Sequence, residues 1–197
     1  MHKKYISISL LLLAVVALIR WGIVSRGEMP HDEQKLQVAA SFYPLYFLAD
    51  EIAGDVAHVF TIIPAGAEPH EYEPSAQDIA RMYESDMLIV NGAGIEPWLE
   101  DVSKNIDTER TAIIVAGEPL ATERMIEEGE EVADPHVWLD PVLVQEMVSR
   151  IADGFVSRDP DRGALYLANA EALRAKLASL DVDYRRELSM CEQHTIV

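Results

Sequence analysis

Cysteine is almost absent from this chain, because Cys191 is the single thiol among 197 residues. One thiol cannot form an internal disulfide, so stability has to come from a packed core. Hydrophobic residues make up 49% of the sequence, which is enough to build such a core in one domain or slightly more. Cys191 itself is expected to be a small buried hydrophobe near a strand.

Basic residues are also scarce. The sequence contains 16 Lys and Arg against 34 Asp and Glu, which gives a formal net charge of −18. Four of the basic residues lie in the first 26 positions, which contain no acid, so the rest of the chain is still more acidic. A body this acidic repels phosphate backbones, so no nucleic-acid partner is expected, whereas cations suit it.

Several signatures of catalysis are missing as well. The chain has no HExxH pair, no nucleophile elbow and no phosphate-binding loop. The glycines of "NGAG", residues 91–94, lack the rest of a dinucleotide-binding fingerprint. These absences argue against an enzyme of the corresponding classes, and no catalytic residue is assigned.

The N-terminal segment, residues 1–26, has the pattern of a targeting sequence. Two lysines precede an apolar run of about 15 residues, the upper end for a signal-peptide core and short for a full membrane span. The segment is therefore either a signal peptide or a retained membrane anchor, followed by a polar tether at 27–35. In both cases the acidic body is exported to the periplasm or another extracytoplasmic space. No cysteine near its end is available for lipid attachment.

Apolar β-rich segments alternate with segments of helical periodicity. This alternation predicts an α/β fold whose N-terminal lobe has a four-stranded, mostly parallel sheet flanked by helices. Ser75, with Asp78 three residues later, indicates a capped helix start. The expected strands are 36–42, 56–64, 86–94 and 111–117, and the expected helices between them are 44–54, 75–85 and 95–106.

The second half of the chain is expected to be helical after an acid-rich mobile loop at 118–135. A helix over 140–159 precedes an apolar stripe between Pro160 and Met190, where a helix of about 30 residues would be about 45 Å long. The sequence therefore predicts an α/β lobe over 36–158, a linking helix over 159–191 and, over 192–197, the start of a truncated second lobe. Without that lobe the apolar stripe is expected to cause dimerisation or aggregation.

Two similar histidine motifs lie in loops of the predicted sheet. "AEPHEYEPS", residues 67–75, carries His70 after the second strand, and "ADPHVWLDP", residues 133–141, carries His136 after the fourth. Loops at the carboxyl ends of parallel strands form the usual site of an α/β fold, and neutral imidazole is a common zinc ligand. Asp134 or Asp140 could accept the second ring N–H of His136 and orient it.

An isolated histidine is more often a satisfied polar residue than a ligand, so the other histidines carry less weight. His58 lies inside a strand pattern and is expected to be packed or exposed on the sheet. Trp98 and Trp138 are expected to anchor the core or the loops. The glutamates of 127–131 are expected to form a solvated face. The remaining histidines are His2 and His31 in the leader and tether, and His194 near the last residues.

Three segments together resemble one known family. "ASFYPLYFLADEIAGD", "PAGAEPHEYEPSAQDIARMYESDMLIVNGAGIEPWLED" and "DPHVWLDP" are similar to the zinc/manganese-binding solute-binding proteins of ABC transporters, the adhesin-like metal-uptake proteins with a rigid linking helix. The resemblance implies two α/β lobes joined by a long helix, with metal held between them and delivered to a membrane permease rather than used in catalysis.

The same resemblance assigns His70 and His136 to the two metal ligands of the family's first lobe. It implies Zn²⁺ as the bound metal, with Mn²⁺ as the alternative, and two further ligands from a second lobe. His194 does not match a ligand position. The chain differs from some members of the family in two ways. It has no histidine in the segment 118–135, and it has no lipid-attachment cysteine.

Two other functions compete with transport. A metal-dependent hydrolase could use His70 and His136 with Asp134 or Asp140, and Glu71 as the base that activates water. An adhesin-like module could use the same fold without transport. Imidazole ligands favour zinc, whereas an oxygen-rich completion of the site would favour manganese.

Overall fold

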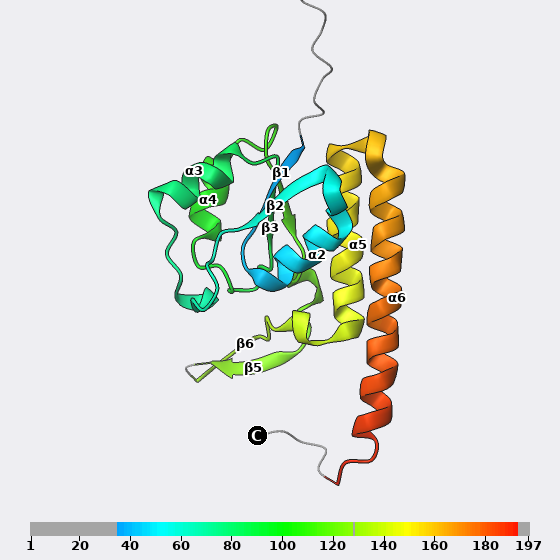
Figure 1. The fold of residues 1–197 in the computed structure, drawn as a ribbon. Helices are drawn as coiled ribbons and strands as arrows, with labels where there is room; N and C mark the ends of the chain where they lie inside the picture. The colour runs from blue at the N-terminus through cyan, green and yellow to red at the C-terminus, as the bar shows by residue number, and fades with distance from the viewer. Residues whose placement is uncertain (1–34, 128, 193–197) are drawn as a thin grey trace, which may run out of the picture. The chain divides into compact units, whose positions relative to one another are not determined.

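The computed structural model describes residues 35–127 and 129–192, which form one α/β unit around a four-stranded sheet (Figure 1). The strand order is β2-β1-β3-β4, and every neighbouring pair is parallel. This arrangement confirms the predicted α/β class and the parallel sheet. The strands are β1 (Leu36–Ala40), β2 (Ala57–Thr61), β3 (Met87–Val90) and β4 (Ala112–Val115).

Helices cover both faces of the sheet (Figure 1). Helices α3 and α4 pack on one face, α2 and α5 on the other, and α6 lies outside them against α2 and α5. Each of the first three helices joins two successive strands. The helices are α2 (Tyr43–Ala53), α3 (Ala76–Glu84), α4 (Leu99–Asn105), α5 (Pro141–Arg158) and α6 (Gly163–Leu188).

The core forms because the strands are apolar on both faces. All four residues of β3 are buried, as expected for a central strand of a covered parallel sheet. On one face they meet Leu45, Ile151 and Phe155, and on the other Met82 and Trp98. Burial of these side chains is the main favourable contribution to folding, at about 1.5–3 kcal/mol for each fully buried aliphatic or aromatic residue.

Local signals set the ends of the helices as the sequence predicts. Pro44 lies in the first turn of α2, and the chain leaves that helix at Gly54, whose φ of 55° is a conformation that favours glycine. Ser75 and Asp78 form a complete capping box at the start of α3, with each side chain accepting a hydrogen bond from the other's backbone N–H.

Helix α6 confirms the predicted long helix, although it begins at Gly163 because Pro160 starts a short 3₁₀ turn instead. Its 26 residues correspond to about 39 Å. Tyr166 and Leu173, in its first half, are buried, whereas Tyr184 and Leu188 near its end are exposed. The first half therefore belongs to the lobe, and the second half presents apolar side chains to solvent. Dimerisation through these side chains stays a prediction.

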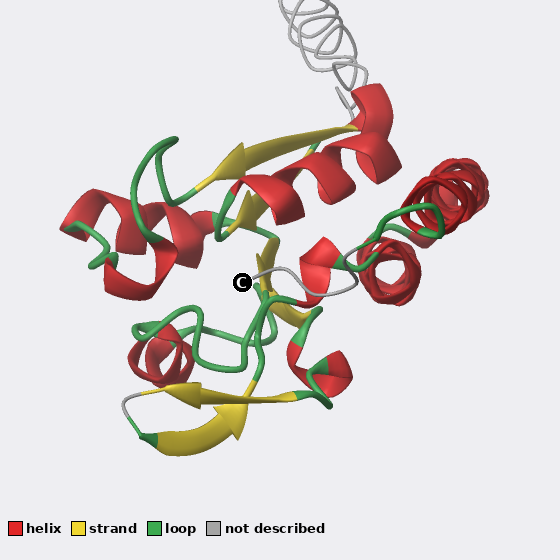
Figure 2. Ribbon diagram, turned by 90° about the horizontal axis from the view of Figure 1, so that it is seen from below, coloured by secondary structure: helices red, strands yellow, loops and turns green. Residues whose placement is uncertain are grey.

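The structure corrects the expectation of a mobile loop at 118–135. This segment contains a short 3₁₀ helix, η3 (Glu118–Leu120), and an antiparallel hairpin of β5 (Arg124–Glu127) and β6 (Glu130–Ala133) (Figure 2). Met125 and Val132 face each other and are partly buried, and Gly129 has the positive φ of 90° that turns favour. Because the segment is rich in acids, its two strands were not recognisable in the sequence.

Cys191 is a second correction. It is exposed in the turn that follows α6, not buried beside a strand. The strand expected near it, together with His194, falls on residues 193–197, which lie outside the described residues. The predicted leader at 1–26, residue 128 and all of the predicted tether at 27–35 except Lys35 lie outside them as well. In the part of the chain that is described, no helix is both long and apolar enough to cross a membrane.

Candidate metal site

The first histidine loop follows β2. The chain passes through a loop to the short 3₁₀ helix η2 (Pro69–Glu71). Pro69 is the first residue of this helix and His70 the second. The carboxylate of Glu68 accepts a hydrogen bond from the backbone N–H of His70 at 3.4 Å. This contact is exposed, so it orients the short helix without tying it to the core.

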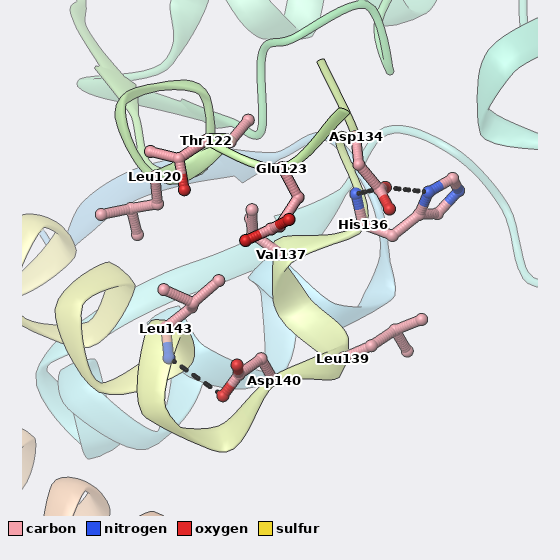
Figure 3. A pocket seen from close by; sticks show the side chains of 10 residues that line it. Leu120, Thr122, Glu123, Asp134, His136, Val137, Leu139, Asp140 and Leu143 are labelled. Atoms are coloured by element: carbon pink, nitrogen blue, oxygen red, sulfur yellow. Dashed lines mark hydrogen bonds and ion pairs between the residues drawn. The ribbon is translucent and has the colours of Figure 1, made fainter. Parts of the chain in front are cut away.

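The second histidine loop follows the β5–β6 hairpin. One carboxylate oxygen of Asp134 accepts hydrogen bonds from the backbone N–H of His136 at 3.0 Å and from its ring Nδ1 at 2.8 Å (Figure 3). Next along the chain is the 3₁₀ helix η4 (Val137–Leu139), where the ring of Trp138 packs edge-on against Phe42 with centroids 4.9 Å apart. The loop is thus held on both sides of His136.

Asp140, the other acid that the sequence offers as a partner of His136, caps a helix instead. Its carboxylate accepts a hydrogen bond from the backbone N–H of Val142 at 2.7 Å. It also accepts one from the backbone N–H of Leu143 at 3.4 Å (Figure 3). These bonds cap the N-terminus of α5, a role worth about 1 kcal/mol. Asp134 is therefore the residue that orients the imidazole.

The fold brings the two predicted ligands together. The ring centroids of His70 and His136 are 5.7 Å apart, and the ring planes make an angle of 52°. Both side chains are half-buried at the carboxyl edge of the parallel sheet, the place that the strand order predicts for a site. The ring centroid of Trp138 lies 5.2 Å from that of His136.

The electrostatics of Asp134 determine which nitrogen of His136 is available. The hydrogen bond from the backbone N–H of His136, helped by the one from its ring, holds the pKa of the Asp134 carboxyl below its usual value. An ionised carboxylate only accepts hydrogen bonds, so Nδ1 of His136 carries the proton. The lone pair of Nε2 is then free to bind a cation.

A buried polar network lies directly behind the His136 loop. The side-chain amide of Asn91 donates to the carbonyl oxygen of Pro135 at 3.0 Å. The carboxylate of Glu96 accepts from the backbone N–H groups of Asn91 and Gly92, each at 2.8 Å, and from the Ser41 hydroxyl at 2.5 Å. Burial raises the pKa of the Glu96 carboxyl, although these hydrogen bonds act in the opposite direction.

Sequence reasoning missed this network. Asn91 lies in "NGAG", which by itself is only a weak nucleotide-binding signal, and Glu96 lies in the segment 95–106, which the sequence predicts to be helical. The one hint in the sequence was a polar residue placed immediately after the fully apolar strand β3, at the edge of the sheet where sites form. A buried carboxylate at position 96 had no signal in the sequence.

A hollow of about 300 Å³ opens beside His136 on the side of the hairpin. Its wall combines the acids of the loop with apolar residues of the hairpin base and the start of α5 (Figure 3). Three carboxylates face this region from Glu123, Asp134 and Asp140. The hollow beside His136 is therefore lined by both acidic and apolar side chains.

Within residues 35–127 and 129–192, no three His, Cys, Asp or Glu side chains converge closely enough to hold a metal ion. His70 and His136 are thus a pair of nitrogen donors without a third protein ligand in the described chain. Glu71, considered as a catalytic base, has an exposed side chain next to His70.

The other side chains singled out in the sequence have structural positions. His58 is exposed on β2, with its ring 6.0 Å from that of Phe60. Trp98 is buried between α4 and the sheet, and Trp138 packs on the edge of the larger core, so both anchor the structure as expected. His2, His31 and His194 lie outside the described residues.

Comparison with known proteins places these features in a family. The family described as "Zinc-uptake complex component A periplasmic" matches residues 38–197. The zinc-binding lipoprotein AdcA of Streptococcus pneumoniae is 35% identical over 201 residues, covering 96% of this chain and 40% of that protein. The manganese-binding lipoprotein MntA of Halalkalibacterium halodurans is 35% identical over 188 residues, covering 94% and 61%.

Solved structures agree with this assignment. The Zn(II)-bound ZnuA-like domain of Streptococcus pneumoniae AdcA superimposes with a TM-score of 0.70 at 36% identity, covering 81% of this chain and 58% of that chain. The chain spans between 40% and 61% of the length of these three relatives, whose names describe zinc or manganese binding. The chain belongs to the family of periplasmic zinc-uptake component A, the metal-binding solute-binding proteins of ABC transporters.

Proposed function

We propose that this chain is part of an exported protein that captures Zn²⁺, with Mn²⁺ as the alternative, through His70 and His136. The distance between the two rings carries the proposal. Two imidazoles bound to one tetrahedral zinc, with Zn–N bonds of about 2.0–2.1 Å, have ring centroids about 5 Å apart. The 5.7 Å separation of His70 and His136 is close to that value.

The chemistry of the donor set also suits zinc. The bond from Nδ1 of His136 to Asp134 leaves Nε2 as the metal-binding atom and makes the imidazole a stronger donor. Zinc prefers imidazole nitrogen, whereas manganese prefers oxygen ligands. The two histidines therefore favour zinc, and acidic groups that complete the shell would shift the preference towards manganese.

Two imidazoles fill only half of a zinc coordination sphere. Water or carboxylates have to supply the rest in this chain, so the affinity is expected to be low compared with a complete four-ligand site. The matched relatives are longer than this chain. Tight capture in a cleft between two lobes, with further ligands from the second, is accordingly proposed for the complete protein.

Delivery of the metal to an ABC permease follows from the family and is proposed on that basis. The proposed division into an α/β lobe over 36–158 and a linking helix over 159–191 would suit this role, because the two histidines would then lie at the edge of the lobe. Residues 1–26 would direct export or hold the protein at the membrane, and 27–35 would act as the tether.

Calorimetric titration of the chain with zinc and with manganese tests the proposal. The matched variants are the double change His70→Ala with His136→Ala and the control His58→Ala, which removes an exposed imidazole on β2. We expect weak binding of about one zinc ion that the double change abolishes and the control preserves. Binding that survives the double change would contradict the ligand assignment.

A further inference from the structure

The side chain of Asn91 joins two parts of the chain that are distant in the sequence. Asn91 is fully buried immediately after β3, and its Nδ2 donates to the carbonyl oxygens of Gly92 at 3.1 Å and Pro135 at 3.0 Å. The second bond spans 44 residues and ends on the peptide unit that precedes His136. A central strand of the sheet is thus tied directly to a proposed ligand.

The orientation of this amide is fixed by its surroundings. Reversing the amide would place its Oδ1 against the two carbonyl oxygens, and no atom of that contact could donate a hydrogen bond. On the other side, a Cβ added to Gly117 would lie 2.1 Å from Oδ1 of Asn91, so only glycine leaves room there. Oδ1 itself has no hydrogen-bond partner among the described residues.

The backbone of Asn91 is held as firmly as its side chain. Glu96 accepts from the backbone N–H of Asn91 through Oε1 and from that of Gly92 through Oε2. Ser41, at the end of the neighbouring strand β1, donates its hydroxyl to the same carboxylate. The network therefore extends from two adjacent strands through Asn91 to the His136 loop.

We propose that Asn91 is a positioning residue for metal binding: its buried bond to Pro135 fixes the place of the His136 ring relative to that of His70. Asp134 sets the rotation of the imidazole, and Asn91 sets the position of the backbone that carries it. The inference rests on the proposed function, because it assigns Asn91 a role in that same site. Groups that support metal ligands typically change metal affinity about 10- to 100-fold when removed.

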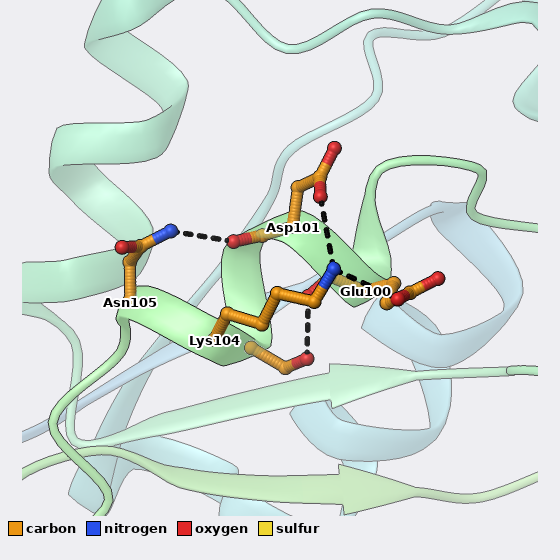
Figure 4. A network of polar contacts seen from close by, with 5 residues as sticks. Glu100, Asp101, Lys104 and Asn105 are labelled. Atoms are coloured by element: carbon orange, nitrogen blue, oxygen red, sulfur yellow. Dashed lines mark hydrogen bonds and ion pairs between the residues drawn. The ribbon is translucent and has the colours of Figure 1, made fainter.

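The matched experiment compares two Asn→Ala changes. Asn91→Ala removes the bond to Pro135, whereas Asn105→Ala removes an exposed amide that donates to the Asp101 carbonyl on α4 (Figure 4). We expect Asn91→Ala to weaken zinc binding about 10-fold or more and Asn105→Ala to change it less than twofold. Equal zinc affinities for Asn91→Ala and the unchanged chain would overturn the inference.

A decrease in the overall stability of the protein has to be distinguished from a displacement of the His136 ring. Thr111→Val serves this purpose, because it removes a buried hydrogen bond to the Ser85 carbonyl at the amino-terminal edge of β4, at the other end of the strands from the histidines. We expect this variant to lower the melting temperature while leaving zinc affinity within twofold. If Thr111→Val weakens zinc binding as much as Asn91→Ala, the effect is general destabilisation and the inference fails.

A measurement on the unchanged chain does not depend on any variant folding. If the Asn91 bond favours zinc binding, zinc must strengthen that bond to the same degree, because coupling between two events is reciprocal. Hydrogen exchange of the Asn91 side-chain amide, followed by NMR, should therefore slow when zinc is added. Unchanged exchange at saturating zinc would contradict the inference, whereas failure of the chain to bind zinc through His70 and His136 would contradict the proposed function itself.

Discussion

The loop of His136 is joined to the core by a buried hydrogen bond and an aromatic contact, whereas the hydrogen bonds of the His70 loop are local and its link to the core is the packing of Ala67 and Tyr72. Asn91 and Trp138 connect the His136 loop to β3 and to Phe42, through a buried hydrogen bond and an aromatic contact. In the His70 loop, residues 64–72, the backbone N–H groups of Ala67, His70, Glu71 and Tyr72 donate to acceptors of the same loop.

This difference suggests unequal roles for two ligands of the same chemical type. A fixed imidazole supplies a prepared position for the metal, because little ordering remains to be done when the metal binds. A ligand on a locally held loop can move by the small distance that closes the pair around the ion. The observed 5.7 Å separation, slightly wider than two zinc-bound rings require, is consistent with such a closing movement.

The largest predicted contrast concerns the carboxylates beside the two histidines. Asp134→Asn removes the charge that the Nδ1–H of His136 faces, so zinc affinity should fall about 10- to 100-fold. Glu68→Gln removes a charge that contacts only the backbone N–H of His70, at 3.4 Å, so its effect should stay below about threefold. Calorimetry on both variants measures the contrast, and equal losses would contradict unequal anchoring.

The second contrast concerns stability. Trp138→Ala removes a half-buried ring that packs against Phe42, and we expect the free energy of unfolding to fall by about 2 kcal/mol. Tyr72→Phe, in the His70 loop, removes only the hydroxyl bond to Asp78 at 3.0 Å and should cost less than about 1 kcal/mol. Urea unfolding measures both free energies. A larger decrease in the free energy of unfolding for Tyr72→Phe than for Trp138→Ala would mean that the His70 loop is the more firmly held of the two.

The smallest predicted effect is confined to a range of pH. Burial raises the pKa of Glu96 in the folded protein, so the folded state binds this proton more tightly than the unfolded state. The stability contributed by Glu96 is therefore complete below its ordinary pKa and is lost as the pH rises through the raised value. The free-energy difference between the unchanged chain and Glu96→Gln should shrink with rising pH. A difference that grows instead would mean that the hydrogen bonds outweigh burial.

Glu100→Gln on α4 is the matched control for this pH dependence. Its carboxylate is exposed and forms a surface ion pair with Lys104 at 2.8 Å (Figure 4). Exposed pairs of this kind are screened by water and salt and contribute little to stability. If burial of Glu96 causes the predicted effect, the change at the exposed Glu100 should not reproduce it.

The two histidine loops also show how far the sequence could predict the structure. The strand and helix pattern, the capping box of Ser75 and the pairing of His70 with His136 follow from local periodicity and from parallel topology, both of which the sequence carries directly. The hairpin at 124–133 was not predicted, because its acidic composition resembled a loop. The Asn91–Pro135 bond was not predictable, because it depends on a contact between residues 44 positions apart.

The most direct test of the central claim is NMR of the histidine ring nitrogens during a zinc titration. The account predicts that the Nε2 signal of His136 and one ring nitrogen of His70 shift together and saturate at one zinc ion per chain, while Nδ1 of His136 stays protonated by its bond to Asp134. A shift of only one ring, or a zinc-induced loss of the proton on Nδ1 of His136, would contradict a site shared by these two loops.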